Sequence, residues 1–279
     1  MKFVIPEKEE YKITLIGCGG TGGYLAQSLA RIASDFDFPI NLTFIDGDTV
    51  EEKNIGRQNF FPFEIGNNKA QVLAERYSLA LATEIRYIDS YIDDSPSNDI
   101  LSTLFTSDII ISAVDSAKAR KNIHKTIKTI KDKVNNNIGF YNPSFFTENK
   151  PGLMVWIDAG NGQNSGQIIL GNTFDMNLLN KQVKKNGTIN FIPYPSIQEP
   201  DLINPKKEKE SENNPNLSCA ERLALKEQSL TINSIMASAV ASIINNLLNQ
   251  KGVLAHKIII SEEIPAMYPV MIESLFTKG

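Results

Sequence analysis

Cysteine and histidine are scarce in this chain of 279 residues, which carries only two of each. The cysteines are Cys18 and Cys219, and the histidines are His124 and His256. Two cysteines cannot build a disulfide framework or a four-cysteine zinc site, and the two histidines stand far apart in the sequence. We therefore expect no structural metal centre, and the cysteine content fits a protein of the reducing cytoplasm.

The chain also lacks an excess of positive charge and a long apolar run. Its 28 basic and 32 acidic residues give a formal net charge of −4, which argues against a dedicated nucleic-acid surface. No apolar run approaches the roughly 20 residues that span a bilayer. Residues 1–12 contain no apolar segment typical of a secretory signal. We expect neither nucleic acid nor a membrane among the partners.

Alternating strand and helix patterns fill the first half of the chain. Strands are expected at residues 12–16, 41–45, 84–88 and 108–113, and helical spacing covers 24–32, 68–81 and 117–130. The strand at 108–113 is largely apolar, as in a parallel strand that is buried on both faces. The alternation predicts an α/β fold, namely a Rossmann-like, doubly wound, mostly parallel sheet with helices on both faces.

The second half of the chain has a different pattern. Two strands at 153–157 and 167–170, joined by a glycine- and asparagine-rich turn, are expected to add antiparallel sheet in the C-terminal half. Residues 197–218 are poor in apolar side chains and rich in proline and charge, which predicts a long polar crossover loop. A long helix reaching Leu248 and two strands near 257–260 and 268–272 complete the chain.

A glycine-rich turn follows the first expected strand, in the segment KITLIGCGGTGG at residues 12–23. Glycines permit a tight turn and allow backbone N–H groups to approach phosphates at a helix N-terminus. The pattern alone is a weak signal, because G-x-G-x-x-G serves many nucleotides and also occurs as a tight turn with nothing bound. The glycines of this turn are Gly17, Gly19, Gly20, Gly22 and Gly23.

The segment IDGDTVEEKNIGRQ at residues 45–58 is the most informative part of the chain. Asp46, directly after the second expected strand, can hold a ribose hydroxyl of either NAD or an adenosine nucleotide. Asn54, Arg57 and Gln58 follow, and a dinucleotide oxidoreductase has no standing need for them. The combination therefore favours a nucleotide with more phosphate to bind.

Three charged residues indicate how a triphosphate would be held. Arg57 can fork across two phosphate oxygens, and Lys69 acts as a mobile point charge. Asp115 stands at the end of the 108–113 strand, where a carboxylate can hold Mg²⁺ against phosphates. The alternatives are surface salt bridges for Arg57 and Lys69, and a cap on the next helix for Asp115.

These residues together resemble the ThiF/MoeB/ubiquitin-activating-enzyme superfamily. The matching positions are the glycine pattern of 17–22, the run from Asp46 to Gln58, Lys69, and Val114 with Asp115. Members of this superfamily use ATP and Mg²⁺ to adenylate the C-terminal carboxylate of a ubiquitin-like or sulfur-carrier protein. The detailed match covers about the first 120 residues. The overall layout looks most similar to the ThiF-like proteins of bacterial PRTRC gene clusters.

The resemblance implies a role for each matching residue. The glycine loop would face the nucleotide, Asp46 the ribose and Asp115 the Mg²⁺, while Arg57 and Lys69 would act on the phosphates during catalysis. It also implies a homodimer and one domain over 1–279, with a nucleotide-binding half (1–150) and a partner-binding half (151–279). The nucleotide-binding set is Gly17, Gly19, Gly20, Gly22, Asp46, Asp48, Asn54, Arg57, Gln58 and Lys69.

Cys219 stands just after the expected polar loop and before the long helix. Many members of the superfamily carry a thioester-forming cysteine at a similar place, and a helix N-terminus would lower the pKa of its thiol. The alternative is a half-buried structural thiol. Ser218 can cap the helix in either case. Cys18, inside the glycine turn, is interpreted as a packing residue.

The chain departs from the better-known members at three points. No arginine precedes Arg31, so an N-terminal arginine that reaches the partner subunit's site is missing or replaced by Lys2, Lys8 or Lys12. Ser116 stands where an asparagine usually follows the magnesium aspartate, and zinc-binding cysteine pairs are absent. These departures concern the partner arrangement and the catalytic rate more than ATP binding. Two alternatives to an adenylating enzyme stay open: a catalytically weak nucleotide-binding scaffold for a small protein and, ranked below it, an NAD- or FAD-dependent enzyme.

Overall fold

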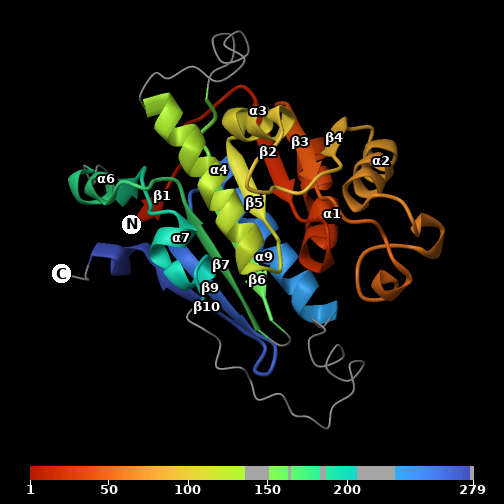
Figure 1. Ribbon diagram of the computed structural model, residues 1–279. Helices are drawn as coiled ribbons and strands as arrows, with labels where there is room; N and C mark the ends of the chain where they lie inside the picture. Colours follow the sequence, from red (N-terminus) through yellow and green to blue (C-terminus); the bar gives the residue numbers. More distant parts are fainter. Residues whose placement is uncertain (136–150, 163–164, 183–186, 206–229, 277–279) are drawn as a thin grey trace.

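An eight-stranded sheet forms the centre of the protein, as seen in a computed structural model that describes residues 1–279 except 136–150, 163–164, 183–186, 206–229 and 277–279 (Figure 1). Its strand order is β10-β9-β7-β6-β5-β2-β3-β4. The strands from β4 to β6 run parallel, and β7, β9 and β10 pair antiparallel. The strands are β2 (Tyr11–Ile16), β3 (Ile40–Ile45), β4 (Ile85–Ile88), β5 (Ile109–Ser112), β6 (Val155–Asn161), β7 (Ser165–Gly171), β9 (Ala255–Ser261) and β10 (Ala266–Met271).

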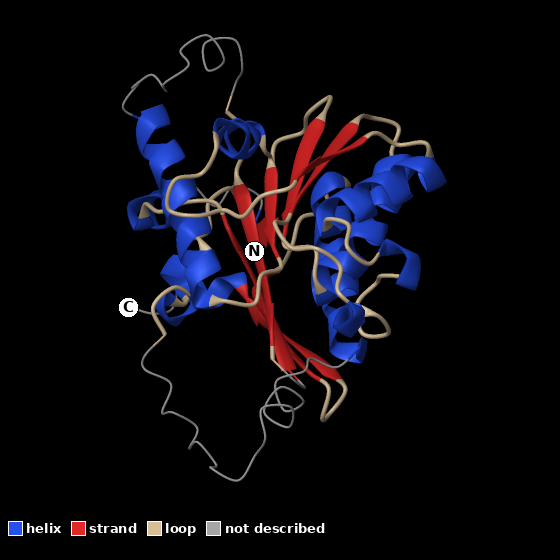
Figure 2. Cartoon of the chain, turned by 45° about the vertical axis from the view of Figure 1, so that its right-hand side comes forward, coloured by secondary structure: helices blue, strands red, loops and turns tan. Residues whose placement is uncertain are grey.

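Helices cover both faces of this sheet, which Figure 2 shows as two blue layers on either side of the red strands. One layer holds α1 (Gly20–Asp35), α2 (Lys69–Leu81) and α9 (Leu230–Leu248), and the other holds α3 (Asn98–Thr106) and α4 (Ala117–Asn135). Each layer closes a separate cluster of buried apolar side chains against the sheet. The predicted fold class, a mostly parallel Rossmann-like sheet with added antiparallel strands, is confirmed.

The order of the strands makes the carboxyl end of β2 the switch point of the sheet. From β2 the chain continues to β3 and β4 on one side, and it later returns to β5 and β6 on the other side. Ile16, the last residue of β2, is in register with Ile45 of β3 and Ser112 of β5. The carboxyl ends of three parallel strands therefore meet at the point where the strand order reverses, which is where open α/β sheets bind ligands.

Several elements differ from the sequence-based expectation. Helix α3 was not predicted, although Ser97 caps it by accepting a hydrogen bond from the Ile100 N–H at 3.3 Å. Two short helices, α7 (Pro195–Gln198) and η4 (Pro200–Leu202), occupy the start of the expected polar loop. Proline in the first turn favours such helical turns, because its φ is already set. The remainder of that loop, from 206, lies outside the described residues.

Smaller elements lie beside the main sheet. A second, two-stranded sheet pairs β1 (Lys2–Phe3) with β8 (Thr188–Ile189) in parallel. The remaining short elements of the described residues are the helix α6 (Met176–Lys181) and the 3-10 turns η1 (Glu52–Asn54), η2 (Pro62–Glu64) and η5 (Ile272–Phe276).

Helix α9 is more apolar than the sequence reading allowed. Its Thr231–Leu248 window has a mean hydropathy of 1.3, so by length and composition it is one helix in the described residues that could cross a membrane. However, 56% of that window is buried inside the protein, where α9 packs against α1, β6 and β7. This burial is typical of a core helix, which passes the same test of length and composition.

Candidate functional site

The glycine turn joins β2 to α1 in a conformation that needs glycine at two positions. Gly17 has φ +89°, and its N–H donates to the Ile45 carbonyl at 2.9 Å. A Cβ on Gly22 would lie 1.9 Å from the Gly17 carbonyl oxygen, so no side chain fits there. Helix α1 has no side-chain cap and no acidic residue in its first turn. Its N-terminus therefore presents backbone N–H groups and positive dipole charge without a capping side chain or an acidic residue in its own first turn.

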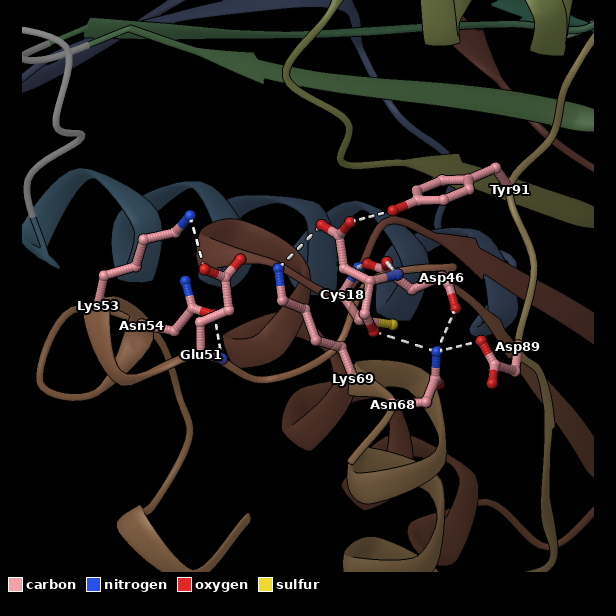
Figure 3. A network of polar contacts seen from close by, with 10 residues as sticks. Cys18, Asp46, Glu51, Lys53, Asn54, Asn68, Lys69, Asp89 and Tyr91 are labelled. Carbon is pink, nitrogen blue, oxygen red and sulfur yellow. Dashed lines mark hydrogen bonds and ion pairs between the residues drawn. The ribbon is translucent and has the colours of Figure 1, made fainter. Parts of the chain in front are cut away.

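Asp46 follows β3 and lies directly beside the glycine turn (Figure 3). Its Oδ2 accepts the Cys18 N–H at 2.6 Å, and its Oδ1 accepts the Asp48 N–H at 2.8 Å. Burial raises the pKa of the Asp46 carboxyl, although the two backbone donors act in the opposite direction. A carboxylate has about four acceptor directions. Two of them are used here, so Asp46 retains capacity to accept a hydroxyl donor.

Lys69, the first residue of α2, points into the site and forms an ion pair there. Its Nζ lies 3.0 Å from Asp48 Oδ2, and only 7% of its side chain is exposed. The hydroxyl of Tyr91 donates to the other oxygen of Asp48. Burial raises the pKa of Asp48, but the bonds from Tyr91 and Lys69 outweigh that effect and lower it below its ordinary value. The side chain of Lys69 is thus buried, and its charge is engaged by Asp48, so its predicted role on phosphates stays a prediction.

Tyr91 closes the outer side of this site, and sequence reasoning missed it. Its ring lies across Gly47, where a Cβ would be 2.6 Å from a ring carbon, and 61% of the residue is exposed. The hydrogen bond to Asp48 raises the pKa of the Tyr91 phenol to about 12. Tyr91 comes from the segment after β4, and no local pattern in the sequence marks it.

We expect the pKa of Tyr91 to be visible in a spectrophotometric titration of the phenolate. Subtracting the titration curve of a Tyr91→Phe variant from that of the unmodified protein should leave the curve of one phenol that ionises near pH 12. In an Asp48→Asn background the same difference should move toward the ordinary value near pH 10, because the charged acceptor is gone. An unchanged titration in Asp48→Asn would contradict the contact between Tyr91 and Asp48.

Asn68 holds the loop that carries Asp46 against α2. Its Oδ1 caps α2 by accepting the Gln71 N–H at 2.9 Å. Its Nδ2 lies 2.7 Å from the Asp46 carbonyl and 2.6 Å from Asp89 Oδ1 (Figure 3). Asn68 thereby fixes the start of the helix that carries Lys69. An asparagine directly before a helical pattern is a start signal that could have identified it from the sequence.

The segment with Asn54, Arg57 and Gln58 lies beside the glycine turn, and its polar groups are partly used. Asn54 is buried, and its Oδ1 accepts the Glu51 N–H at 2.9 Å, while its side-chain N–H donates to no group among the described residues. Arg57 Nε donates to the Lys53 carbonyl at 2.8 Å. Gln58 lies over Gly19, where a Cβ would be 3.9 Å from its Nε2, and its Oε1 is buried without a partner in the described structure.

Asp115 stands in the turn between β5 and α4, next to the glycine turn. A Cβ on Gly17 would lie 2.7 Å from the Ala113 carbonyl oxygen, so the two turns are in close contact. Asp115 is exposed, and no hydrogen bond or ion pair to its carboxylate occurs in the described part of the chain. The cap of α4 is Ser116, whose Oγ accepts the Ala119 N–H at 3.2 Å. The alternative role of Asp115 as a helix cap is therefore wrong.

Three other sequence-based assignments can be placed only in part. Cys18 is fully buried, and burial followed by the charge of Asp46 raises its pKa well above the ordinary value, which fits a packing residue. Cys219 lies outside the described residues, as does Ser218. Lys8, a candidate to replace the missing arginine, donates to buried Asp108 at 2.7 Å, just before the amino end of β5. Within its own chain Lys8 is therefore engaged far from the glycine turn.

The structure brings the glycine turn, Asp46, Lys69 and Asp115 to the carboxyl ends of β2, β3 and β5. It also places Gln58 over that turn. It does not place Arg57 in contact with Lys69, so their convergence on one ligand stays a prediction. Sequence reasoning missed Asn233 of α9 as well, whose Oδ1 accepts the Thr21 hydroxyl at 3.1 Å and joins α9 to the first turn of α1.

The family of the chain follows from comparison with known proteins. The model of the ThiF family matches residues 7–256, so the chain belongs to the ThiF family. A search of curated proteins gave no match. Among solved structures, PaaA is similar with a TM-score of 0.57 and 19% identity, covering 95% of this chain and 64% of that chain. At such identity the likeness establishes the fold.

Escherichia coli MccB is a second group of structural neighbours. The structure of MccB with ATP has a TM-score of 0.55 and 15% identity, covering 94% of this chain and 64% of that chain. The structure of MccB with AMPCPP and MccA has a TM-score of 0.54 and 15% identity, covering 95% of this chain and 64% of that chain. The present chain thus spans about two thirds of the length of the structures that it matches.

Proposed function

We propose that this protein is an ATP-dependent adenylyltransferase that activates a carboxylate. The observation that carries the proposal is the arrangement at the carboxyl ends of β2, β3 and β5. An uncapped helix N-terminus, the buried cation of Lys69 and the Asp46 carboxylate lie there, together with the carboxylate of Asp115, which has no partner among the described residues. Membership of the ThiF family supports it, as does a solved complex of the structurally similar MccB with ATP.

The polar groups of the site fit an adenosine triphosphate. Asp46 has acceptor capacity for a ribose hydroxyl, and the first turn of α1 offers N–H groups to phosphate oxygens. The side-chain N–H of Asn54 and the buried side-chain oxygen Oε1 of Gln58 are two further polar groups without a partner in the described chain. A triphosphate offers Lys69 and the other donors more anionic oxygens than the diphosphate of NAD or FAD does, so we rank a dinucleotide below ATP.

The residues also fit a Mg²⁺ ion that is shared with phosphates. No group of three or more histidine, cysteine or acidic side chains among the described residues could hold a metal by itself. One exposed carboxylate at Asp115 suits Mg²⁺, which is usually bound through one or two carboxylates plus phosphate oxygens and water. When bound, the ion would neutralise part of the charge on the triphosphate.

The chemistry needs positioning and charge neutralisation more than proton transfer. A carboxylate oxygen of the substrate forms a bond to the α-phosphorus, and the bond from that phosphorus to the bridging oxygen breaks. Pyrophosphate leaves with the electron pair. The attacking carboxylate is already ionised at pH 7, so no general base is required. Lys69, Arg57 and the N–H groups of α1 would bring the anions together and stabilise the developing charge.

The substrate that we propose is the C-terminal carboxylate of a small ubiquitin-like or sulfur-carrier protein. The structure of MccB in complex with N-formylated MccA supports the proposal that a site on this fold accepts a polypeptide. Residues 151–279 would bind that partner, a homodimer would be the working form, and Cys219 could take the activated chain as a thioester. A cytoplasmic location and a place in a PRTRC gene cluster belong to the same proposal.

The proposal is tested by ATP–pyrophosphate exchange with the purified protein and candidate small proteins that end in glycine. Exchange that depends on the small protein is expected, and Arg57→Ala should lower its rate on the order of 10²-fold, the scale of one preorganised electrostatic donor. Folded protein that exchanges with no such candidate would contradict the proposal.

A nucleotide-binding scaffold is the second candidate function. The pairing of Lys69 with Asp48 favours it, because this cation is already engaged within the chain. A scaffold would bind ATP without exchange, and Arg57→Ala would leave that binding unchanged. A rise in melting temperature with NAD or FAD, but not with ATP, would instead favour a dinucleotide enzyme.

A further inference from the structure

A buried polar network lies directly behind the turn that carries Asp115. Its centre is Asp158 of β6, which is 0% exposed. Asp158 Oδ1 accepts the Ser112 hydroxyl at 2.6 Å, and Arg120 Nε lies 3.0 and 3.1 Å from the two carboxylate oxygens. Ser112 Oγ in turn accepts the Trp156 indole N–H at 2.7 Å. The network thus joins β5, β6 and the first turn of α4.

Arg120 extends this network to the backbone of the Asp115 turn. Its Nη2 donates to the Val114 carbonyl at 2.5 Å, and its backbone N–H donates to the Ser116 carbonyl at 3.2 Å. The Ser116 hydroxyl is fixed by the Ala119 N–H. The residues on both sides of Asp115 are therefore held, while the Asp115 carboxylate is exposed with no bonding partner in the described ranges. That combination describes a rigid turn that presents one carboxylate.

The ion pair provides a geometry that an apolar pair cannot provide. Replacing a buried ion pair by packed apolar residues is often neutral for stability, so stability alone does not explain Arg120 and Asp158. The planar guanidinium can donate in two fixed directions, here to a carboxylate and to a carbonyl. Asp158 holds the guanidinium, and the guanidinium holds the peptide plane between Val114 and Asp115.

We propose that Arg120 is a positioning residue that sets the direction of the Asp115 carboxylate toward the phosphate end of the nucleotide site, with Asp158 as its anchor. This inference rests on the proposed function for the identity of the ligand, but the restraint on the turn does not. The Asp115 turn packs closely against Gly17. If the Asp115 turn moved, the position of the Asp115 carboxylate relative to the glycine turn would therefore change as well.

The test variant is Arg120→Lys, which keeps a positive charge opposite Asp158 but has a single nitrogen in place of the separate Nε and Nη2 that bond Asp158 and the Val114 carbonyl. Lys8→Met is the matched control, because it removes the cation from Asp108, another fully buried carboxylate, before the amino end of β5. Both variants are expected to lower the melting temperature. Asp158→Asn is a second, milder variant that keeps an oxygen acceptor for Arg120 Nε.

The first readout is hydrogen exchange of the ligand-free protein over residues 114–120. Arg120→Lys should speed exchange of the Ala119 amide, and Lys8→Met should not. The second readout is the Mg²⁺ concentration that gives half of the thermal shift with a non-hydrolysable ATP analogue. Arg120→Lys should raise it on the order of tenfold or more, as expected when the residue that orients a metal ligand is lost. Asp158→Asn should also speed amide exchange and raise the Mg²⁺ midpoint, but by less than Arg120→Lys does.

Two results would overturn the inference. One is Arg120→Lys with exchange of residues 114–120 like that of the unmodified protein. The other is a loosened turn with an unchanged Mg²⁺ midpoint, which would make the network structural only. If the unmodified protein binds no ATP analogue, the proposed function fails, and the exchange comparison alone then decides whether Arg120 restrains the turn.

Discussion

Lys69→Met is expected to lower the rate of ATP–pyrophosphate exchange by about 10²-fold or more, the scale seen when one preorganised electrostatic donor is removed. The ammonium of Lys69 is largely shielded from solvent, where a charge acts through a lower dielectric than on the surface. A triphosphate would offer it more negative charge than Asp48 does. Methionine keeps the length and the apolar stem, so the loss isolates the charge.

Lys53→Met is the matched control for this prediction. Lys53 lies in the same region and also pairs with a carboxylate, Glu51 at 2.8 Å, but 64% of its side chain is exposed. Screened surface pairs contribute little, so its loss should leave the exchange rate within about twofold. Equal rates for Lys69→Met and the unmodified protein would show that Lys69 serves only its ion pair with Asp48.

The glycine turn and the parallel strands could be predicted because their requirements are local. A tight turn after an apolar strand needs glycine for steric reasons, and the structure gives Gly17 a positive φ and Gly22 no room for a Cβ. Parallel strands that are buried on both faces leave near-continuous apolar runs, as at 108–113. The positions of Asp46 and Asp115 at strand ends follow from the same pattern.

The contacts that tune the site could not be predicted, because they depend on how distant segments pack. Lys69 meets Asp48 across 21 positions and Tyr91 meets Asp48 across 43, which only the packing of α2 and β4 against β3 decides. Arg120 belongs to a helical stretch rich in lysine, AKARKNIHK, which looks like a solvated face. Arg120 is buried because it pairs with Asp158 of β6, which lies 38 positions further along the chain.

The polar loop shows how composition misleads about local structure. Proline and charge predict irregular chain from 197, yet Pro200 stands in the first turn of η4, and α7, which begins just before the loop at Pro195, runs into it. The fully buried side chain of Tyr194, which donates to the Met154 carbonyl at 2.9 Å, anchors α7. One buried tyrosine gives that segment a tertiary contact that average hydropathy does not register.

Gly22→Ala is expected to abolish ATP binding and to destabilise the protein by about 3 kcal/mol or more, at the upper end of the cost of overpacking. The new Cβ would lie 1.9 Å from the Gly17 carbonyl oxygen, a backbone atom that cannot rotate away as a flexible side chain would. The turn must therefore open, and its N–H groups lose the arrangement that phosphate binding needs.

Gly23→Ala separates this steric effect from a general effect of alanine in α1. The Cβ at position 23 would meet its nearest neighbour, Asn59 Cβ, at 3.4 Å, which is ordinary contact. Alanine also favours a helix over glycine by about 1 kcal/mol, so Gly23→Ala should keep its melting temperature and its thermal shift with ATP. If both variants retained that shift, nucleotide binding would not depend on the closed turn. If only Gly22→Ala lost it, the geometry between residues 17 and 22 would be the requirement.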